Sequence, residues 1–373
     1  MKQYNLLDVC EVYQPQTIAT KDFVDGGKYF VYGANGAIGL YDKYNHENSE
    51  VLMACRGASC GTINISKPYS WINGNAMVIH PKGTVPITQK YLAYCLKALD
   101  KRNIISGTAQ PQITRNNMKD FCIPVCDVSE QEKIVCKIEE LFSTLENAVE
   151  TLNKTKEQLA VYRHSVLKDA FGKFIEKKKI RDMSVVVTSG SRGWAKYYAD
   201  EGARFIRITD LTRDGISLKN DSIKYVKLPD NVEGKRSRLK ANDVLVSITA
   251  DLGSIALIPE NIPEAYINQH IAMIRFINPV QGKFMSWYLK SDYGQKDLLK
   301  NKRGGGKLGI GLDDIRDTFV PVVEDEKAIA TVKEIDARLS ACENIEKTID
   351  TIKKQIEAMR HSILKNAFEG RFI

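Results

Sequence analysis

The sequence predicts an α+β protein in which two similar α/β domains are separated by two long helices that pair as an antiparallel coiled coil. Three observations predict this fold class: an internal repeat, two stretches of seven-residue apolar periodicity, and short strand-like runs between turn signals. The expected segments are 1–127 for the first domain, 128–175 for the first helix, 176–323 for the second domain and 324–373 for the second helix.

The repeat is visible by direct alignment. Residues 135–171 match residues 332–368 at a constant offset of 197, with 15 identities in 37 positions. Shorter matches extend the repeat upstream, pairing 51–52 with 244–245, 72–73 with 267–268, 107–113 with 304–310, and 123–125 with 320–322. Between these anchors the two copies differ widely. We therefore expect two similar scaffolds that carry different loops.

Each helical segment has apolar residues at every seventh position. In the first copy the two apolar lines are Ile138, Leu145, Leu152, Leu159, Val166 and Ile134, Leu141, Ala148, Thr155, Tyr162. In the second copy they are Ile335, Cys342, Ile349, Ile356, Ile363 and Ile345, Ile352, Met359. This spacing is typical of a coiled coil, and a single apolar seam needs a partner in water. The other copy can supply that partner, and a two-fold axis across the pair makes the helices antiparallel.

Local signals refine the boundaries. Ser129 and Glu132 form a capping-box pattern that predicts the start of the first helix. Arg338 interrupts the second apolar line, so we expect that end of the pair to splay. Strands are expected at 29–32, 51–54, 204–208 and 243–248, with a turn at 35–36.

Composition favours a soluble globular chain with a polyanionic partner. The 373 residues are 43% apolar and carry a net charge of +8. The sequence contains no apolar run of membrane-spanning length, and its first residues lack the apolar stretch of a secretory signal, so we expect a cytoplasmic protein that does not bind membranes. Basic residues cluster near 177–181, 235–240 and 300–307, which favours phosphate contacts.

The sequence predicts neither catalytic residues nor a metal site. It lacks the Asn/Asp-Pro-Pro-aromatic tetrapeptide of an adenine methyltransferase, and the run 304–307 lacks the spacing of a phosphate-binding loop. Asp313, Asp314 and Asp317 fit helix-start surface acids better than a metal cluster. The eight cysteines fit buried, reduced thiols better than disulfides or zinc ligands.

Several loops instead carry residues suited to reading DNA bases. Arg and Lys can donate to guanine, and Asn and Gln can pair with adenine. In the first domain the candidates are Tyr32, Asn35, Arg56, Ser59, Asn73, Asn75, Gln110 and Gln112. In the second domain they are Ser189, Ser191, Arg192, Trp194, Lys196, Tyr197, Arg207, Asp210, Lys302, Arg303 and Lys307. The second domain has 307–309 where the first has Gln-Pro-Gln at 110–112, which argues against identical readout at these positions.

The order of these motifs resembles the specificity subunits of type I restriction–modification systems over essentially the full chain. The resemblance rests on 32–36, 56–61, 71–76, 106–113 and 123–125 for one class of target recognition domain, on 188–198 for another class, and on the repeated helix ends at 163–171 and 360–368, which are similar to the family's two spacer regions.

The resemblance implies that each domain reads one half of a split site in double-stranded DNA and that the coiled coil sets the gap. It also implies that two modification (methyltransferase) subunits bind the chain and that two restriction subunits can join them. S-adenosylmethionine, ATP and magnesium then belong to these partners, and the chain itself needs no cofactor.

Two other readings stay open at this point. A coiled-coil scaffold whose globular domains bind other proteins explains the helices and the repeat, but not the basic, amide-rich loops. A stand-alone DNA methyltransferase or nuclease is disfavoured by the missing catalytic motifs.

Overall fold

The chain folds into two compact units. Unit 1 comprises Met1–Asn153 and Asp350–Ile373, and unit 2 comprises Lys154–Ile349. Each unit therefore combines one globular domain with a segment of each long helix. The computed structural model describes residues 1–107, 110–229, 235–300, 302–303 and 308–372.

Unit 1 contains two main sheets. The antiparallel four-stranded sheet has the order β2 (Cys10–Tyr13), β8 (Ala76–Pro81), β5 (Val51–Ala54) and β6 (Ile63–Ile65). The three-stranded sheet has the order β4 (Gly36–Tyr41), β3 (Tyr29–Gly33) and β7 (Trp71–Ile72), with β7 parallel to β3. The remaining elements of this domain are β1 (Lys2–Asn5), α1 (Leu6–Val9), η1 (Thr20–Asp22), α2 (Gln89–Ala98), η2 (Arg102–Ile104), η3 (Arg115–Met118) and β9 (Cys122–Val125). The expected strands at 29–32 and 51–54 are confirmed, and the turn expected at 35–36 lies one residue earlier, at 34–35.

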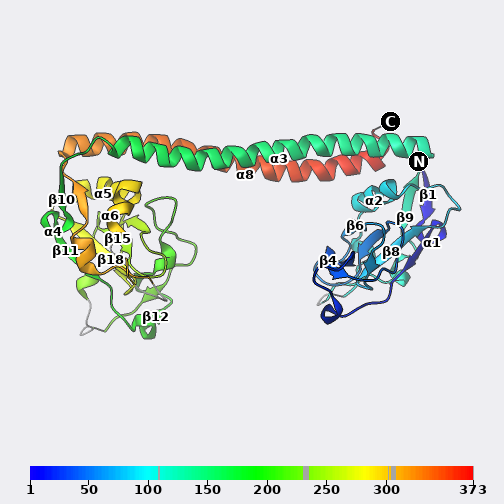
Figure 1. Ribbon diagram of the computed structural model, residues 1–373, viewed down its shortest axis with the longest axis horizontal. Helices are drawn as coiled ribbons and strands as arrows, with labels where there is room; N and C mark the ends of the chain where they lie inside the picture. Colours follow the sequence, from blue (N-terminus) through cyan, green and yellow to red (C-terminus); the bar gives the residue numbers. More distant parts are fainter. Residues whose placement is uncertain (108–109, 230–234, 301, 304–307, 373) are drawn as a thin grey trace. The chain divides into compact units, whose positions relative to one another are not determined.

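The core of unit 1 forms where α2 packs between the four-stranded sheet and the long helices (Figure 1). Tyr91 of α2 is fully buried, and its ring meets the Phe368 ring edge-to-face at 5.2 Å. Ile138 from the start of the first long helix and Leu364 from the end of the second belong to the same apolar cluster. The C-terminal part of the chain thus completes the core of the N-terminal domain.

Unit 2 repeats this topology. Its antiparallel sheet has the order β11 (Ser184–Ser189), β18 (Ile271–Phe276), β15 (Val244–Ser247) and β16 (Ile255–Leu257). A second sheet has the order β12 (Tyr198–Ala199), β14 (Tyr225–Val226), β13 (Ala203–Ile206) and β17 (Ala265–Ile267), with β17 parallel to β13. The remaining elements are β10 (Lys177–Lys179), α4 (Ile180–Met183), η4 (Trp194–Tyr197), η5 (Ile208–Asp210), η6 (Lys235–Ser237), η7 (Pro279–Gln281), α5 (Gly282–Lys290), α6 (Asp292–Leu298), α7 (Leu312–Arg316) and β19 (Phe319–Pro321).

The core of unit 2 follows the same plan. Phe284 of α5 is fully buried and meets the Phe171 ring at 5.3 Å, as Tyr91 meets Phe368 in unit 1. The end of the first long helix and the start of the second, including Ile335, pack into this cluster. Equivalent positions of the repeat therefore form equivalent cores.

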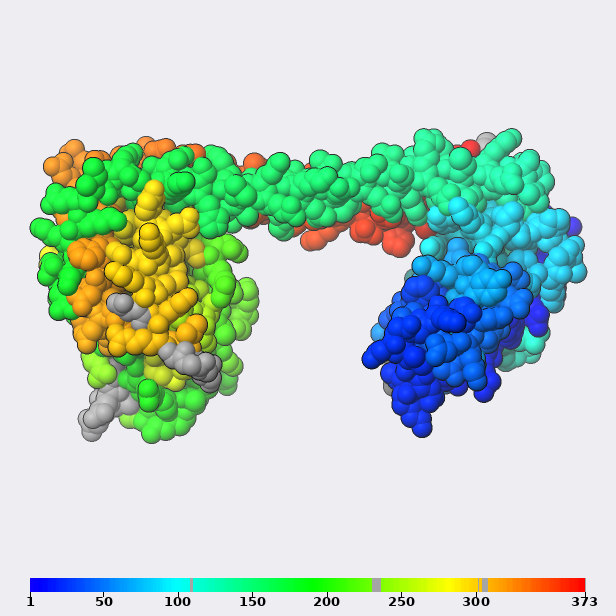
Figure 2. Space-filling view, viewed as in Figure 1, coloured from blue at the N-terminus to red at the C-terminus, as the bar shows by residue number. Residues whose placement is uncertain are grey.

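The long helices are α3 (Val128–Phe171) and α8 (Asp325–Phe368), and they pair in an antiparallel coiled coil. In unit 1, Lys353 donates to Asn153 at 2.6 Å, and Arg360 lies 3.7 Å from Glu146. Residue numbers along α8 therefore increase as those of their partners on α3 decrease, so the two helices run antiparallel. In unit 2, Arg163 pairs with Glu346 at 2.9 Å, and Asp169 lies 4.0 Å from Arg338. Figure 2 shows the green surface of α3 against the orange-to-red surface of α8. The antiparallel pairing is confirmed within each unit.

The seam differs from the expected pattern in one respect. The first apolar line is largely buried, with Ile349 only 3% exposed. The second line is open at Tyr162, Ile345 and Met359, of which Met359 is 51% exposed. The buried apolar stripe between the helices can be narrower than expected, because each helix end also packs on its domain.

The expected splaying at Arg338 is wrong. The Arg338 guanidinium lies 5.2 Å from the centre of the Tyr162 ring, and its Nε donates to the Tyr162 hydroxyl at 3.0 Å. Arg338 also lies 3.6 Å from Glu334 on its own helix. The cation therefore contributes to the seam through an aromatic partner instead of opening it.

Three local expectations also change. Asp127, rather than Ser129, caps α3, because its carboxylate accepts from the Glu130 amide at 2.9 Å. The expected strand 204–208 ends at Ile206, after which the chain turns into η5. All eight cysteines are free, but Cys122 and Cys136 are exposed rather than buried.

Within the described ranges, no helix has the length and apolar character needed to cross a bilayer. The same residues include no group of three His, Cys, Asp or Glu side chains placed to hold a metal ion.

Candidate functional site

Three loops of unit 1 converge at the end of β5. The Cys55 amide donates to the Asn75 carbonyl at 3.1 Å, and the Ile113 amide donates to the Cys55 carbonyl at 2.9 Å. Arg56 and Gln112 face each other in an isolated antiparallel bridge. Arg56, Asn75 and Gln112 are all exposed. The backbone thus holds a guanidinium and two amides on neighbouring segments that solvent can reach.

Two other candidates of unit 1 lie inside the scaffold. The Asn73 side chain is buried, and its Oδ1 accepts from the Ile18 amide at 3.0 Å. The Tyr32 side chain is also buried, and its hydroxyl accepts from the Lys67 amide at 3.1 Å. These contacts hold the loop around Ile18 and the segment at Lys67 in place. Both side chains therefore support the loops rather than extend from them.

The remaining candidates of unit 1 lie on the surface of these loops. Asn35 is exposed in the turn between β3 and β4, and Gln110 is exposed next to Pro111. Ser59 is half-buried, and its carbonyl accepts from the Thr62 amide at 2.9 Å.

In unit 2, three of the candidates make their contacts inside the domain: Trp194, Arg207 and Asp210. Trp194 is buried between Phe205 and Tyr266, with ring centroids at 5.8 and 5.3 Å. The Arg207 guanidinium is bound to the buried Asp210 carboxylate at 2.9 Å and to the Ser222 carbonyl at 2.8 Å. These contacts explain why aromatic and charged residues occur here without requiring a ligand.

Other candidates of unit 2 are accessible in part. Arg192 and Lys196 are exposed, and the Lys196 ammonium lies 4.9 Å from the centre of the half-buried Tyr197 ring. Ser189 ends β11 and is half-buried, as is Ser191.

The last candidates fall on the loop that precedes α7. Lys302 and Arg303 are exposed, and the Arg303 guanidinium pairs with Asp314 at 3.1 Å. Lys307 lies outside the described residues. The basic run at 177–181 faces acids of its own domain, because Lys179 and Arg181 both pair with Asp317, at 2.9 and 2.7 Å.

The loop framework of unit 1 recurs in unit 2 at the level of backbone hydrogen bonds. The Ile248 amide donates to the His270 carbonyl at 2.9 Å, and the Ile310 amide donates to the Ile248 carbonyl at 3.0 Å. Gly309 forms isolated antiparallel β-bridges with Thr249 and with Arg303. In the same way, Gln112 forms isolated antiparallel β-bridges with Arg56 and with Ser106. Thr249, His270 and Gly309 thus occupy the backbone positions that Arg56, Asn75 and Gln112 occupy in unit 1.

Sequence reasoning missed Thr249 and His270. The match between 72–73 and 267–268, carried two residues further, places His270 opposite Asn75. Backbone hydrogen bonds confirm this register. The Asn73 amide donates to the Tyr32 carbonyl at 2.9 Å, and the Asn268 amide donates to the Ile206 carbonyl at 3.1 Å. Composition alone could not single out these residues, since neither adds to a basic or amide-rich cluster.

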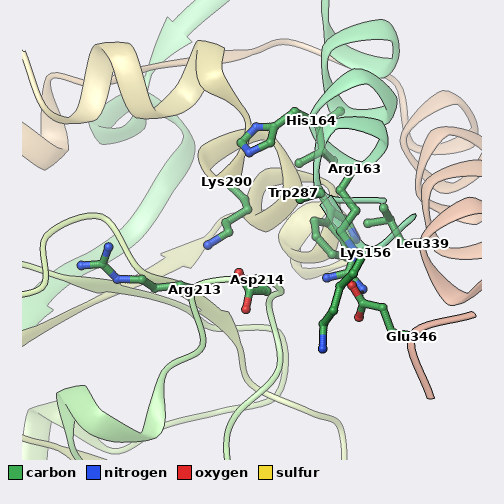
Figure 3. A pocket seen from close by; sticks show the side chains of 11 residues that line it. Lys156, Arg163, His164, Arg213, Asp214, Trp287, Lys290, Leu339 and Glu346 are labelled. Atoms are coloured by element: carbon green, nitrogen blue, oxygen red, sulfur yellow. The ribbon is translucent and has the colours of Figure 1, made fainter. Parts of the chain in front are cut away.

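Unit 2 also has a cavity of about 430 Å³ between α3, α5, α8 and the loop at Arg213 (Figure 3). Its basic side chains already face acids: Arg163 pairs with Glu346 at 2.9 Å, and Arg213 pairs with Asp251. Burial lowers the pKa of Lys290, which also lines the cavity. These pairs connect the helices and the domain within unit 2, and we assign no ligand to the cavity.

The family comparison gives a match along nearly the whole chain. The family described as type I restriction modification DNA specificity domain matches residues 1–159 and 175–358. The chain is 22% identical over 298 residues to the type I restriction enzyme EcoBI specificity subunit of Escherichia coli, a match that covers 71% of this chain and 61% of that relative. It is 23% identical over 347 residues to the type I restriction enzyme MjaVIII specificity subunit of Methanocaldococcus jannaschii, covering 87% of this chain and 79% of that relative.

Two solved structures share the fold. One comes from work on the structural basis of complex assembly and conformational transition of the type I R-M system; it superposes with a TM-score of 0.73 at 16% identity and covers 99% of this chain and 98% of that chain. The other is the HsdS subunit from Thermoanaerobacter tengcongensis, with a TM-score of 0.58 at 16% identity, covering 99% of this chain and 97% of that chain.

Proposed function

Because the chain belongs to the family of type I restriction modification DNA specificity domains, we propose that it reads a split, asymmetric DNA site and directs adenine methylation and restriction by partner subunits. The observation that carries this proposal is the pair of matching loop frameworks, which present different polar side chains in the two units. The chain itself acts as the non-catalytic reader.

Base reading in unit 1 follows from the chemistry of its exposed loop residues. The Arg56 guanidinium can donate two parallel hydrogen bonds to guanine O6 and N7. The amides of Asn75 and Gln112 can each accept from adenine N6 while donating to N7. Their backbone is fixed by the bonds around Cys55, so the three groups are held in place before DNA binds.

The asymmetry of the site follows from the repeat. Two domains on similar scaffolds approach two half-sites in similar ways, and matched symmetry of protein and DNA fixes the spacing of the half-sites. The exposed side chains differ between the units, so the two half-sequences differ as well. Basic side chains such as Lys302 and Arg192 would contact phosphates and position the protein.

The partner subunits supply the chemistry in this proposal. Two modification subunits bind the chain and carry S-adenosylmethionine, and two restriction subunits that use ATP and magnesium can join them. The complex works in the cytoplasm on double-stranded DNA.

Selection from random-sequence duplex DNA tests the proposal. The full chain, purified with its modification subunits, should enrich sequences with two defined blocks separated by a gap of constant length. Enrichment of a single block, or of no sequence, would contradict the proposal and favour a protein-binding scaffold. The chain alone, given DNA, S-adenosylmethionine and magnesium, should yield no methylated product.

A further inference from the structure

We propose that Gln269, His270 and Thr249 form the base-reading group of unit 2, and that Gln269 selects adenine in the second half-site. This inference rests on the proposed function, and it adds three residues that neither composition nor motif spacing points to. Its basis is a row of side-chain hydrogen bonds at the position where unit 1 presents Arg56 and Asn75.

The three side chains form a continuous hydrogen-bonded row. Gln269 Nε2 lies 2.9 Å from His270 Nε2, and Thr249 Oγ1 lies 2.6 Å from His270 Nδ1. When Gln269 donates to Nε2, the imidazole proton is on Nδ1 and is donated to the threonine hydroxyl. The hydroxyl hydrogen of Thr249 is then available as an outward donor. The row therefore has a fixed direction, from the amide through the ring to the hydroxyl.

This direction leaves Gln269 with the two groups that adenine requires. One amide hydrogen goes to His270, while the second hydrogen and the Oε1 acceptor can still bind. An amide with one donor and one acceptor matches adenine N7 and N6, the preferred partner of Gln in the major groove. His270 is a positioning residue in this account, because it orients the amide without contacting the base.

The backbone beneath the row is held as firmly as in unit 1. The Asn268 side chain accepts from the His270 amide at 3.1 Å, and Ser191 bridges Asn268 in a parallel arrangement. Gly190 permits this approach, because a Cβ built there would lie 1.9 Å from the Ile267 carbonyl oxygen. The segment that carries Ser191 thus packs directly on the segment that carries Gln269.

The turn that carries Thr249 is also unusual. Ala250 adopts a φ of +59°, at the position where unit 1 has Gly57 with a φ of +80°. An alanine in the left-handed region is strained by about 1 kcal/mol or more, and such strain is found preferentially at binding loops. The surrounding contacts maintain this turn although alanine does not favour it.

Selection from random-sequence duplex DNA with the full chain and its modification subunits tests the inference. Gln269→Ala should reduce the preference for adenine at one position of one half-site about tenfold and leave the other half-site unchanged. Gln269→Glu should shift that position toward cytosine, because a carboxylate accepts from cytosine N4. His270→Ala should weaken the preference at the same position. Asn75→Ala is the matched control and should alter only the other half-site.

Two results separate this inference from the proposal on which it rests. If the parent chain selects a two-block site and both Gln269 variants select the same site unchanged, the inference is wrong while the proposed function stands. If the parent chain selects no sequence, the proposed function itself fails. Thermal unfolding of each variant identifies any that lose the fold. If His270→Ala is among them, Gln269→Glu decides, because misfolding cannot produce a switch from adenine to cytosine.

Discussion

Units 1 and 2 share a backbone framework and differ in the side chains it presents. The bonds that join Cys55 to Asn75 and Ile113 recur around Ile248 with donor–acceptor distances within about 0.2 Å. Unit 1 places exposed Arg56 and Asn75 on this framework, whereas unit 2 places a half-buried, internally bonded row there. The comparison shows that packing and backbone bonds define the framework, while the side chains placed on it differ between the two units.

The largest expected effect tests the shared scaffold. Phe171→Ala removes a buried ring that contacts Phe174, Phe284 and Tyr288, and should lower the free energy of unfolding by about 3–5 kcal/mol. Phe368→Ala, the equivalent change in unit 1, should cost less because Phe368 is only half-buried. Denaturant unfolding of both variants checks this. Equal losses would show that the two cores are not completed in the way described.

The next effect tests the close approach of two loops in unit 2. Gly190→Ala forces a methyl group against the Ile267 carbonyl and should destabilise the protein by about 1–3 kcal/mol. Gly309→Ala is the control, because its Cβ would lie at an ordinary 3.5 Å from the Ile248 carbonyl oxygen. Thermal melts compare the two variants. A Gly190 variant as stable as the Gly309 variant would contradict the packing at this point.

A further pair of changes separates readout from support. Arg56→Ala should lose about 1–3 kcal/mol of discrimination at one base pair while leaving the melting temperature close to that of the parent. Arg207→Ala should lower the melting temperature instead, since it removes the cationic partner of the buried Asp210 carboxylate. Competition binding with single-base variants of the selected site, together with thermal melts, measures both quantities. A lower melting temperature in the Arg56 variant, with lost base discrimination in the Arg207 variant, would contradict this assignment.

The smallest effect tests the strained turn. Ala250→Gly should stabilise the protein by about 1 kcal/mol or less, because glycine adopts a positive φ without strain. Gly57→Ala, at the equivalent turn of unit 1, should destabilise it by about 1 kcal/mol. Denaturant midpoints at a constant m value resolve both shifts. A loss of stability in the Ala250 variant would rule out the assigned strain.

The sequence predicted the fold well, because a repeat and a heptad seam are long-range patterns that many residues reinforce. It predicted the strand at 51–54 and both long helices for the same reason. It could not predict that Arg338 stacks on Tyr162, because that contact joins residues far apart in the chain. It also could not separate Arg56, which is exposed, from Arg207, which is bound to Asp210: residue type is the same and only the neighbours differ.

Candidate site residues were therefore harder to predict than elements. Tyr32, Asn73 and Trp194 have the polar or aromatic character of reading residues, but their partners lie within the scaffold. His270 has no local motif, and its importance follows from the repeat register together with a backbone bond equivalent to that of Asn75. The equivalence of the two copies identifies His270, which neither copy identifies alone.

Independent readout by the two units is tested most directly by methylome sequencing of cells in which residues 176–323 are replaced by the second domain of another member of the family. If each unit reads its own half-site, one half of the methylated site changes while the other half stays as in the parent. A swap that changed both half-sequences together would contradict the central claim that the two units read DNA independently.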